Sequence, residues 1–265
     1  MGSDPISAIS SLAGLTGWRH LALDQVGSTN AEAMKLATDG DPGQVWVTAK
    51  QQLAGRARRG RSWVSEPGNL YASLLLVNPA EGDAMATLPL VVSLALYEAV
   101  IETCPQAEGR LKIKWPNDLL LDGKKLSGIL LEAQPDTFGR TAVVIGCGVN
   151  CRHYPDNPLY PATSLLESGL DVEPEKLFIR LAGSMARQLR VWARGQGFSI
   201  IRRDWLDRCH GLGQDVVARF SDGEITGKFM DLDQEGLLLL CDNKGQIHRI
   251  SAADIFFGNS GTLGA

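Results

Sequence analysis

The spacing of hydrophobic residues predicts helices and strands in mixed order over residues 29–209. Apolar residues that recur at helical spacing predict helices, and short apolar runs bounded by turn residues predict strands. The predicted helices cover residues 29–37, 87–104, 173–194 and 199–209, and the predicted strands cover residues 45–49, 69–77, 111–115, 119–121, 124–132 and 141–148. Asp122-Gly123 separates two of these strands and predicts a tight β-hairpin.

The pattern changes after Gly211. The remaining residues form short alternating runs separated by turn sequences, of which Ser221-Asp222-Gly223 is the first. Short strands with regularly spaced turns predict a small β-barrel. We therefore expect two domains, residues 1–211 and 212–265.

Length and composition are those of an ordinary globular protein. The 265 residues are 44% hydrophobic and 21% charged, enough for one good core and a small second module. The net charge of −4 and the short apolar runs, such as residues 88–100, argue against nucleic-acid and membrane partners. The five cysteines are odd in number and widely spaced, and residues 1–5 lack signal-peptide features. We therefore expect reduced thiols in a cytoplasmic protein.

Positive charge is concentrated in the segment 55–63, Gly-Arg-Ala-Arg-Arg-Gly-Arg-Ser-Trp. Guanidinium groups this close repel one another, but they match the oxygens of carboxylates and phosphates. A solvated basic loop or a nucleic-acid patch remains an alternative. The segment is not a Walker A motif, and no dinucleotide-binding fingerprint follows a strand here. Without fixed counter-charges, we expect residues 52–65 to be mobile until an anion binds.

A second polar segment is Lys114-Trp115-Pro116-Asn117-Asp118, followed by Lys125 on the returning strand of the hairpin. Its cation, amide and carboxylate could meet a phosphate and its Mg²⁺, because Mg²⁺ prefers oxygen ligands. A single hairpin lysine is more often simply solvated, so Lys125 alone decides nothing.

Two shorter segments have ordinary structural explanations. Ser28-Thr29-Asn30 precedes a predicted helix, where Thr29 and Glu32 fit a capping box, yet its hydroxyls and N–H groups could also bind a polar ligand. Gly146-Cys147-Gly148-Val149-Asn150 ends a strand and could be a tight turn.

In their order and spacing, these segments resemble those of the biotin–protein ligases. The shared motifs are Ser-Thr-Asn, a Gln before the arginine loop, Lys-Trp-Pro-Asn-Asp, Lys-Leu-x-Gly-Ile and Gly-x-Gly-x-Asn, over residues 20–155. The resemblance implies an α+β fold, a mixed β-sheet with flanking helices related to class II aminoacyl-tRNA synthetases, followed by a small SH3-like β-barrel. It also implies biotin and ATP as substrates, with Mg²⁺, and leaves a homodimer open.

The resemblance also assigns roles to residues at the matching positions. The biotin-binding set is Ser28, Thr29, Asn30, Gln52, Arg56, Ala57, Arg58 and Lys125, and Lys125 and Arg58 are the expected catalytic residues. The ATP and adenylate set is Arg59, Arg61, Trp63, Lys114, Asn117, Asp118 and Asn150, with Asp118 as the Mg²⁺ ligand. Ala57 departs from the family, which usually has Gly there, and a positive φ at this position would make the alanine a strained choice.

The implied reaction forms biotinyl-5′-AMP and then transfers biotin to a lysine. The acceptor would be the biotin carboxyl carrier protein or domain of a biotin-dependent carboxylase such as acetyl-CoA carboxylase. A lipoate or octanoate ligase is the nearest alternative, and the arginine loop argues against it. A non-catalytic biotin-binding regulator is the other. Fewer than 30 residues precede Ser28, too few for the N-terminal DNA-binding domain of some family members, so we expect the form without it.

Overall fold

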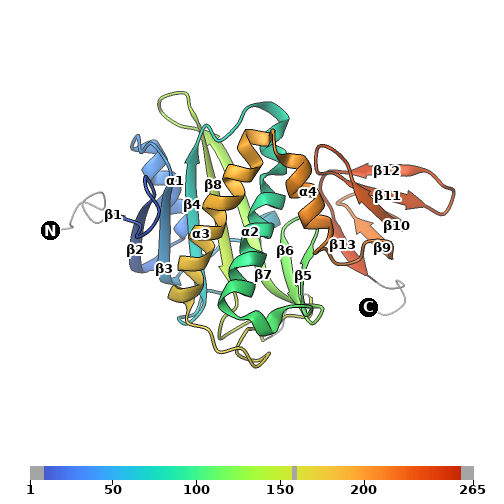
Figure 1. Ribbon diagram of the computed structural model, residues 1–265, viewed down its shortest axis with the longest axis horizontal. Helices are drawn as coiled ribbons and strands as arrows, with labels where there is room; N and C mark the ends of the chain where they lie inside the picture. The colour runs from blue at the N-terminus through green and yellow to red at the C-terminus, as the bar shows by residue number, and fades with distance from the viewer. Residues whose placement is uncertain (1–8, 157–159, 258–265) are drawn as a thin grey trace.

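The computed structural model describes residues 9–156 and 160–257, which form two β-sheets and four α-helices (Figure 1). The helices are α1 (Thr29–Thr38), α2 (Leu88–Thr103), α3 (Pro174–Trp192) and α4 (Phe198–Leu206). The first sheet contains β1 (Ser10–Ser11), β2 (Arg19–Val26), β3 (Val45–Gln52), β4 (Leu70–Val77), β5 (Leu111–Lys114), β6 (Asp118–Leu121), β7 (Lys124–Pro135) and β8 (Thr141–Val149). The second contains β9 (Asp215–Arg219), β10 (Glu224–Leu232), β11 (Leu238–Asp242), β12 (Ile247–Ile250) and β13 (Asp254–Phe257).

The eight-stranded sheet is mixed, as predicted. Its strand order is β1-β2-β3-β4-β8-β7-β6-β5. Helix α1 crosses over between β2 and β3, which pair in parallel, and the other strand pairs are antiparallel. Asp122 and Gly123 both have positive φ, 50° and 76°, which confirms the tight turn between β6 and β7.

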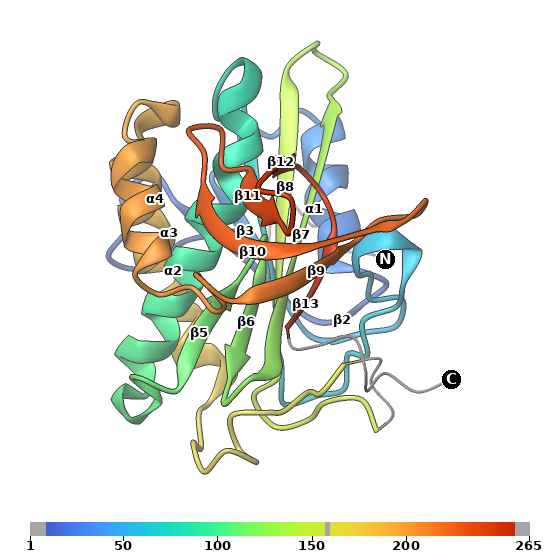
Figure 2. The ribbon, with the colours of Figure 1, turned by 90° about the vertical axis from the view of Figure 1, so that its right-hand side faces the viewer.

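The two faces of this sheet are covered differently. Helices α2 and α3 lie against one face, and α1 packs on the other face over β3, β4 and β8 (Figure 2). Alternation along the strands separates the faces: Leu74 of β4 packs toward α2, whereas Leu75 packs toward α1. The α1 face is therefore left uncovered by helices over β5, β6 and β7.

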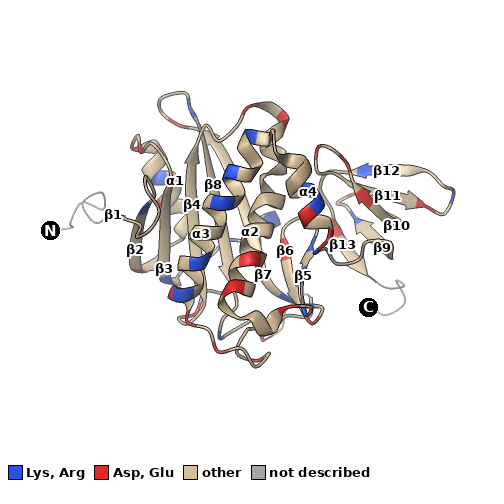
Figure 3. Cartoon of the chain, in the orientation of Figure 1, with Lys and Arg blue, Asp and Glu red and all other residues tan. Residues whose placement is uncertain are grey.

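Helix α2 is apolar almost all round, which is typical of a helix buried on several sides. With the turn before it, the segment Gly82–Thr103 is long and apolar enough to cross a membrane, but 61% of its most apolar window is buried inside the protein. Basic residues of α3 face acidic residues of α2 (Figure 3), where Arg187 pairs with Glu98 and Glu102. Burial in the core accounts for the apolar composition of α2.

The five-stranded sheet is antiparallel, with the order β12-β11-β10-β9-β13. It is held against the first sheet at β5. Ile113 exchanges backbone hydrogen bonds with Arg208 and His210, which lie in the linker between α4 and β9. Trp115 Nε1 donates to the carbonyl of Gly236 at 3.2 Å. Both sheets contribute to one hydrophobic core, so the second sheet is fixed beside Lys114. The boundary near Gly211 stays a prediction.

Most of the predicted elements are present with small shifts at their ends. The long strand β2, near the sheet edge, is absent from the sequence-based prediction. Seven of its eight residues, all except Leu21, are at least partly exposed, and this leaves a weak hydrophobic signal.

Candidate active site

A cavity of about 890 Å³ lies on the sheet face that α2 and α3 do not cover. This volume is within the range of ligand pockets in proteins. Its walls come from the start of α1, the arginine loop, strands β4–β8 and the C-terminal sheet. Of the residues expected to form the site, all line this cavity except Arg59 and Asn117.

Strand alternation decides which side chains face the cavity. Lys114 of β5, Asp118 and Leu120 of β6, and Leu130 of β7 point to this side. Their neighbours in sequence, such as Ile113, are buried in the core under α2. The Lys-Trp-Pro-Asn-Asp segment therefore places one lysine and one carboxylate in the cavity, from two neighbouring antiparallel strands.

One end of the cavity is lined by a chain of hydrogen bonds. Gln52 Oε1 accepts from the Thr29 backbone N–H at 2.9 Å and lies 3.0 Å from the Thr29 hydroxyl. Ser73 Oγ lies 2.8 Å from Thr29 Oγ1 and 2.6 Å from Asn30 Oδ1. The predicted capping box at Thr29 and Glu32 is wrong. The N-cap residue of α1 is Ser28, and its side chain makes no cap hydrogen bond. The Thr29 hydroxyl bonds to Gln52 and Ser73 at the cavity wall.

Glu132 extends this chain to the arginine loop. Its Oε2 accepts from Asn30 Nδ2 at 2.8 Å and from Arg56 at 2.7 Å. Gln52 Nε2 donates to Ser65 Oγ at 2.9 Å at the other end of the loop. Both ends of the loop are thus tied to the polar groups that surround the start of α1.

The middle of the cavity has a floor of glycines beneath Trp63. A Cβ built on Gly148 would lie 2.7 Å from the Trp63 ring, and one on Gly128 would lie 3.1 Å from it. The indole Nε1 is buried and has no hydrogen-bond partner in the described part of the chain. Side chains at these two glycines would fill the space that the indole occupies. Gly146-Cys147-Gly148 lies within strand β8 and is not a tight turn, and the glycine at position 148 makes room for the indole.

The arginine loop is a closed turn. Trp63 N–H donates to the Gly55 carbonyl at 2.9 Å, and Ala57 N–H donates to the Arg61 carbonyl at 2.7 Å. Ala57 has an extended backbone, with φ −123° and ψ 176°, so alanine is not strained at this position. Arg59 does have a left-handed backbone, with φ 58°, which costs an L-residue on the order of 1 kcal/mol.

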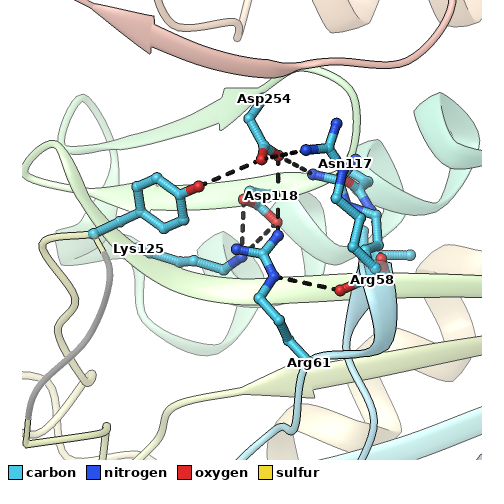
Figure 4. Close-up of polar contacts among 9 residues, drawn as sticks. Arg58, Arg61, Asn117, Asp118, Lys125 and Asp254 are labelled. Carbon is cyan, nitrogen blue, oxygen red and sulfur yellow. Dashed lines mark hydrogen bonds and ion pairs between the residues drawn. The ribbon is translucent and has the colours of Figure 1, made fainter. Parts of the chain in front are cut away.

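Carboxylates lie close to the arginines of the loop. The expectation that the arginine loop has no fixed counter-charges is therefore wrong. Arg59 Nη1 lies 2.9 Å from Asp254 Oδ2, and Arg58 and Arg61 lie 3.8 and 3.9 Å from Oδ1 of the same carboxylate (Figure 4). The Tyr160 hydroxyl lies 3.5 Å from Asp254. Sequence could not suggest this partner, because Asp254 lies in β13, 195 residues from Arg59.

Lys125 and Asp118 form a close pair in the cavity (Figure 4). Lys125 Nζ lies 2.9 Å from each carboxylate oxygen of Asp118. Burial raises the pKa of Asp118, but the charges of Lys125 and Arg58 outweigh burial and leave the pKa below its ordinary value. Asp118 is therefore a buried anion, and Lys125 is not the merely solvated hairpin lysine.

Lys114 lies among aromatic rings at the boundary of the two sheets. Its Nζ is 5.5, 5.9 and 5.7 Å from the ring centroids of Tyr160, Phe256 and Phe257, within the range of cation–π interactions. Burial lowers the pKa of Lys114, with Lys125 and Arg58 adding to this and Asp118 and Asp254 opposing it.

Two of the expected site residues, Asn117 and Asn150, donate hydrogen bonds to backbone carbonyls. Asn117 Nδ2 donates to the Ile129 carbonyl, while its buried Oδ1 lacks a partner among the described residues. Asn150 Nδ2 donates to the Thr163 carbonyl at 3.1 Å. Within residues 9–156 and 160–257, no three His, Cys, Asp or Glu side chains are grouped to hold a metal ion. Of the two carboxylates that line the cavity in the described part of the chain, Asp254 is paired with Arg59. Asp118 by itself fits only a Mg²⁺ ion whose other ligands are phosphate oxygens and water.

Ser73, Glu132 and Asp254 were not among the expected residues. Ser73 is a polar residue inside an apolar strand, a signal that the sequence does contain. Glu132 lies on the same strand face as Gly128, two alternations further along β7.

Comparisons with known proteins decide the family. Residues 23–150 match the biotin/lipoate A/B protein ligase family, and residues 211–258 match the biotin protein ligase C-terminal domain. A biotin–[acetyl-CoA-carboxylase] ligase from Paracoccus denitrificans is 43% identical, over 89% of this chain and 99% of the relative. The chain belongs to the biotin protein ligase family. It is an ATP-dependent biotin–protein ligase.

A second relative and a solved structure of the biotin protein ligase family support this assignment. A biotin–[acetyl-CoA-carboxylase] ligase from Mycobacterium tuberculosis is 32% identical, over 91% of this chain and 90% of the relative. The structure of a biotin protein ligase from Aquifex aeolicus in complex with biotin and ATP has a TM-score of 0.77 and 30% identity, covering 91% of this chain and 99% of that chain. The mixed sheet with a small antiparallel C-terminal domain is therefore the fold of this ligase family.

Proposed function

We propose that the cavity binds biotin and MgATP side by side and joins them. The supporting observation is the order of groups along it. Hydrogen-bonding groups around Thr29 and Gln52 lie at one end, glycines and Trp63 in the middle, and the cations Lys125, Lys114, Arg58 and Arg61 at the other end. This order fits a ligand with a polar ring, an apolar chain and a carboxylate that meets phosphates.

In the first step, a biotin carboxylate oxygen attacks the α-phosphorus of ATP. The new P–O bond replaces the bond to pyrophosphate, which leaves with its electron pair, and biotinyl-5′-AMP remains. Lys125 and Arg58 stabilise the charge on the phosphorus oxygens, and no protein nucleophile is required. Mg²⁺ enters with ATP as part of the substrate, with Asp118 as its protein carboxylate.

In the second step, the neutral ε-amine of a carrier lysine attacks the acyl carbon. The bond to AMP breaks, AMP leaves with the electron pair, and the amine releases a proton. The acceptor is a biotin carboxyl carrier protein or domain of a carboxylase, and acetyl-CoA carboxylase is the one named for the relatives. The closed arginine loop shields the reactive anhydride from water. We expect a cytoplasmic protein.

The test is ATP–pyrophosphate exchange on the purified chain with biotin, lipoate or octanoate. Exchange that requires biotin and Mg²⁺ supports the proposal, and label transfer to a carrier domain supports the second step. Equal exchange with lipoate would assign the chain to the other branch of the family. Biotin binding without exchange would indicate a non-catalytic regulator.

A further inference from the structure

The C-terminal sheet supplies a charged group to the arginine loop. Asp254 begins β13, and its carboxylate is 17% exposed between the two sheets. Three guanidinium groups of the loop surround it, but only Arg59 is within hydrogen-bonding distance. Arg61 Nε donates to the Arg58 carbonyl at 3.4 Å, but the Nη2 groups of Arg58 and Arg61, at 3.8 and 3.9 Å from Asp254, are placed to donate to another anion.

The division of roles among the arginines follows from their positions. Arg58 and Arg61 line the cavity, whereas Arg59 does not and turns toward Asp254. Arg59 also has the left-handed backbone that sets the direction of the loop at this point. The ion pair with Asp254 therefore holds the one loop residue whose backbone conformation an L-residue avoids.

We propose that Asp254 is a positioning residue for adenylate formation, which anchors Arg59 so that Arg58 and Arg61 are held over the phosphate end of the cavity. Asp254 also lines the cavity, but it stays paired with Arg59 when ATP binds and does not touch the substrate. The C-terminal sheet thereby orders the loop of the catalytic domain. This inference rests on the proposed function for its kinetic consequence only.

The first test needs no substrate. Asp254→Asn removes the charge at nearly constant shape, and we expect trypsin to cleave the empty full-length chain after Arg58 or Arg61 about two- to fivefold faster. Asp254→Glu keeps the carboxylate and should keep most of the protection. Asp222→Asn, an equal charge change at an exposed turn of the same sheet, is the control and should cleave like the parent. Equal cleavage of Asp254→Asn and the parent, at equal melting temperature, would overturn the proposal.

The second test separates positioning from competition. In biotin-dependent exchange, we expect Asp254→Asn to raise the KM for ATP and lower kcat, with the KM for biotin unchanged. If Asp254 instead competes with the phosphates, its removal lowers the KM for ATP, and that result overturns the proposal. Arg59→Gln should have the same effect, and the double variant should be no worse than either single variant. If the kinetic effects of the two substitutions multiply in the double variant, Asp254 does not act through Arg59. A parent chain without exchange activity would contradict the proposed function and leave the cleavage test valid.

Discussion

Lys125 Nζ donates to both carboxylate oxygens of the buried Asp118 at 2.9 Å, across the β6–β7 hairpin. Lys125 is the residue expected to contact the carboxylate of biotin, and Asp118 is the residue expected to contact Mg²⁺. A phosphate that enters the cavity therefore meets a cation whose position is already fixed, and fixed charges stabilise a transition state without reorganisation.

We expect Lys125→Ala to reduce the single-turnover rate of adenylate formation by about 10²–10³-fold, because it removes a cation placed where charge develops. Lys124→Ala is the matched control, since Lys124 is the neighbouring residue and is exposed. Its rate should equal that of the parent. Lys125→Ala also leaves Asp118 buried without its partner, so the melting temperature must be measured beside the rate. An unchanged rate in Lys125→Ala would place Lys125 outside the reaction.

The alkaline limit of ATP binding should depend on Lys114. Burial, first among the causes, lowers its pKa, so the ammonium loses its proton at lower pH than an ordinary lysine. ATP binding through this group is present below that pKa and declines as the pH rises through it. Lys114→Arg keeps its charge throughout, so kcat/KM for ATP should decline at higher pH than in the parent. Coincident pH profiles for the two proteins would show that Lys114 does not set this limit.

The glycine floor should be sensitive to a single methyl group. In Gly148→Ala the new Cβ would lie 2.7 Å from the Trp63 ring, so the indole must move into the cavity. We expect the KM for biotin to rise by about tenfold or more, since overpacking costs about 1–3 kcal/mol. Gly223→Ala meets no atom within 4 Å and has no positive φ, which makes it the control. A biotin KM that is unaffected by Gly148→Ala would mean that biotin does not lie along this floor.

Gln52→Ala should impair biotin binding more than ATP binding. It removes the acceptor for the Thr29 N–H and the bond to Ser65, so buried polar groups lose partners at a cost of about 1–3 kcal/mol. Biotin titration by calorimetry should show about tenfold weaker binding. Gln51→Ala, which loses only an exposed contact with Gln25, is the control. Equal weakening in both variants would argue that Gln52 supports the strand and not the ligand.

Local sequence patterns were sufficient to predict most of the eight-stranded sheet and many of the residues that line the cavity. The Asp122-Gly123 turn, the glycine-free helix α2 and the strand alternation are properties of consecutive residues, and each has a short-range cause. The Lys-Trp-Pro-Asn-Asp and Lys-Leu-x-Gly-Ile segments lie on strands of one hairpin meander, so their charged residues converge wherever those strands pair. The misplaced capping box shows the limit, because Thr29 fits a cap locally but its hydroxyl has better partners in Gln52 and Ser73.

The sequence by itself identified most of the charged and polar residues that line the cavity, and only the tertiary structure decided which charges face each other. Arg56 meets Glu132 and Arg59 meets Asp254 because β7 and β13 approach the loop from distant parts of the chain. The second approach depends on the linker beside β5 and on a hydrophobic core shared by both sheets. Such pairings have no local periodicity that marks them, since they result from packing between elements rather than from the conformation of either segment alone.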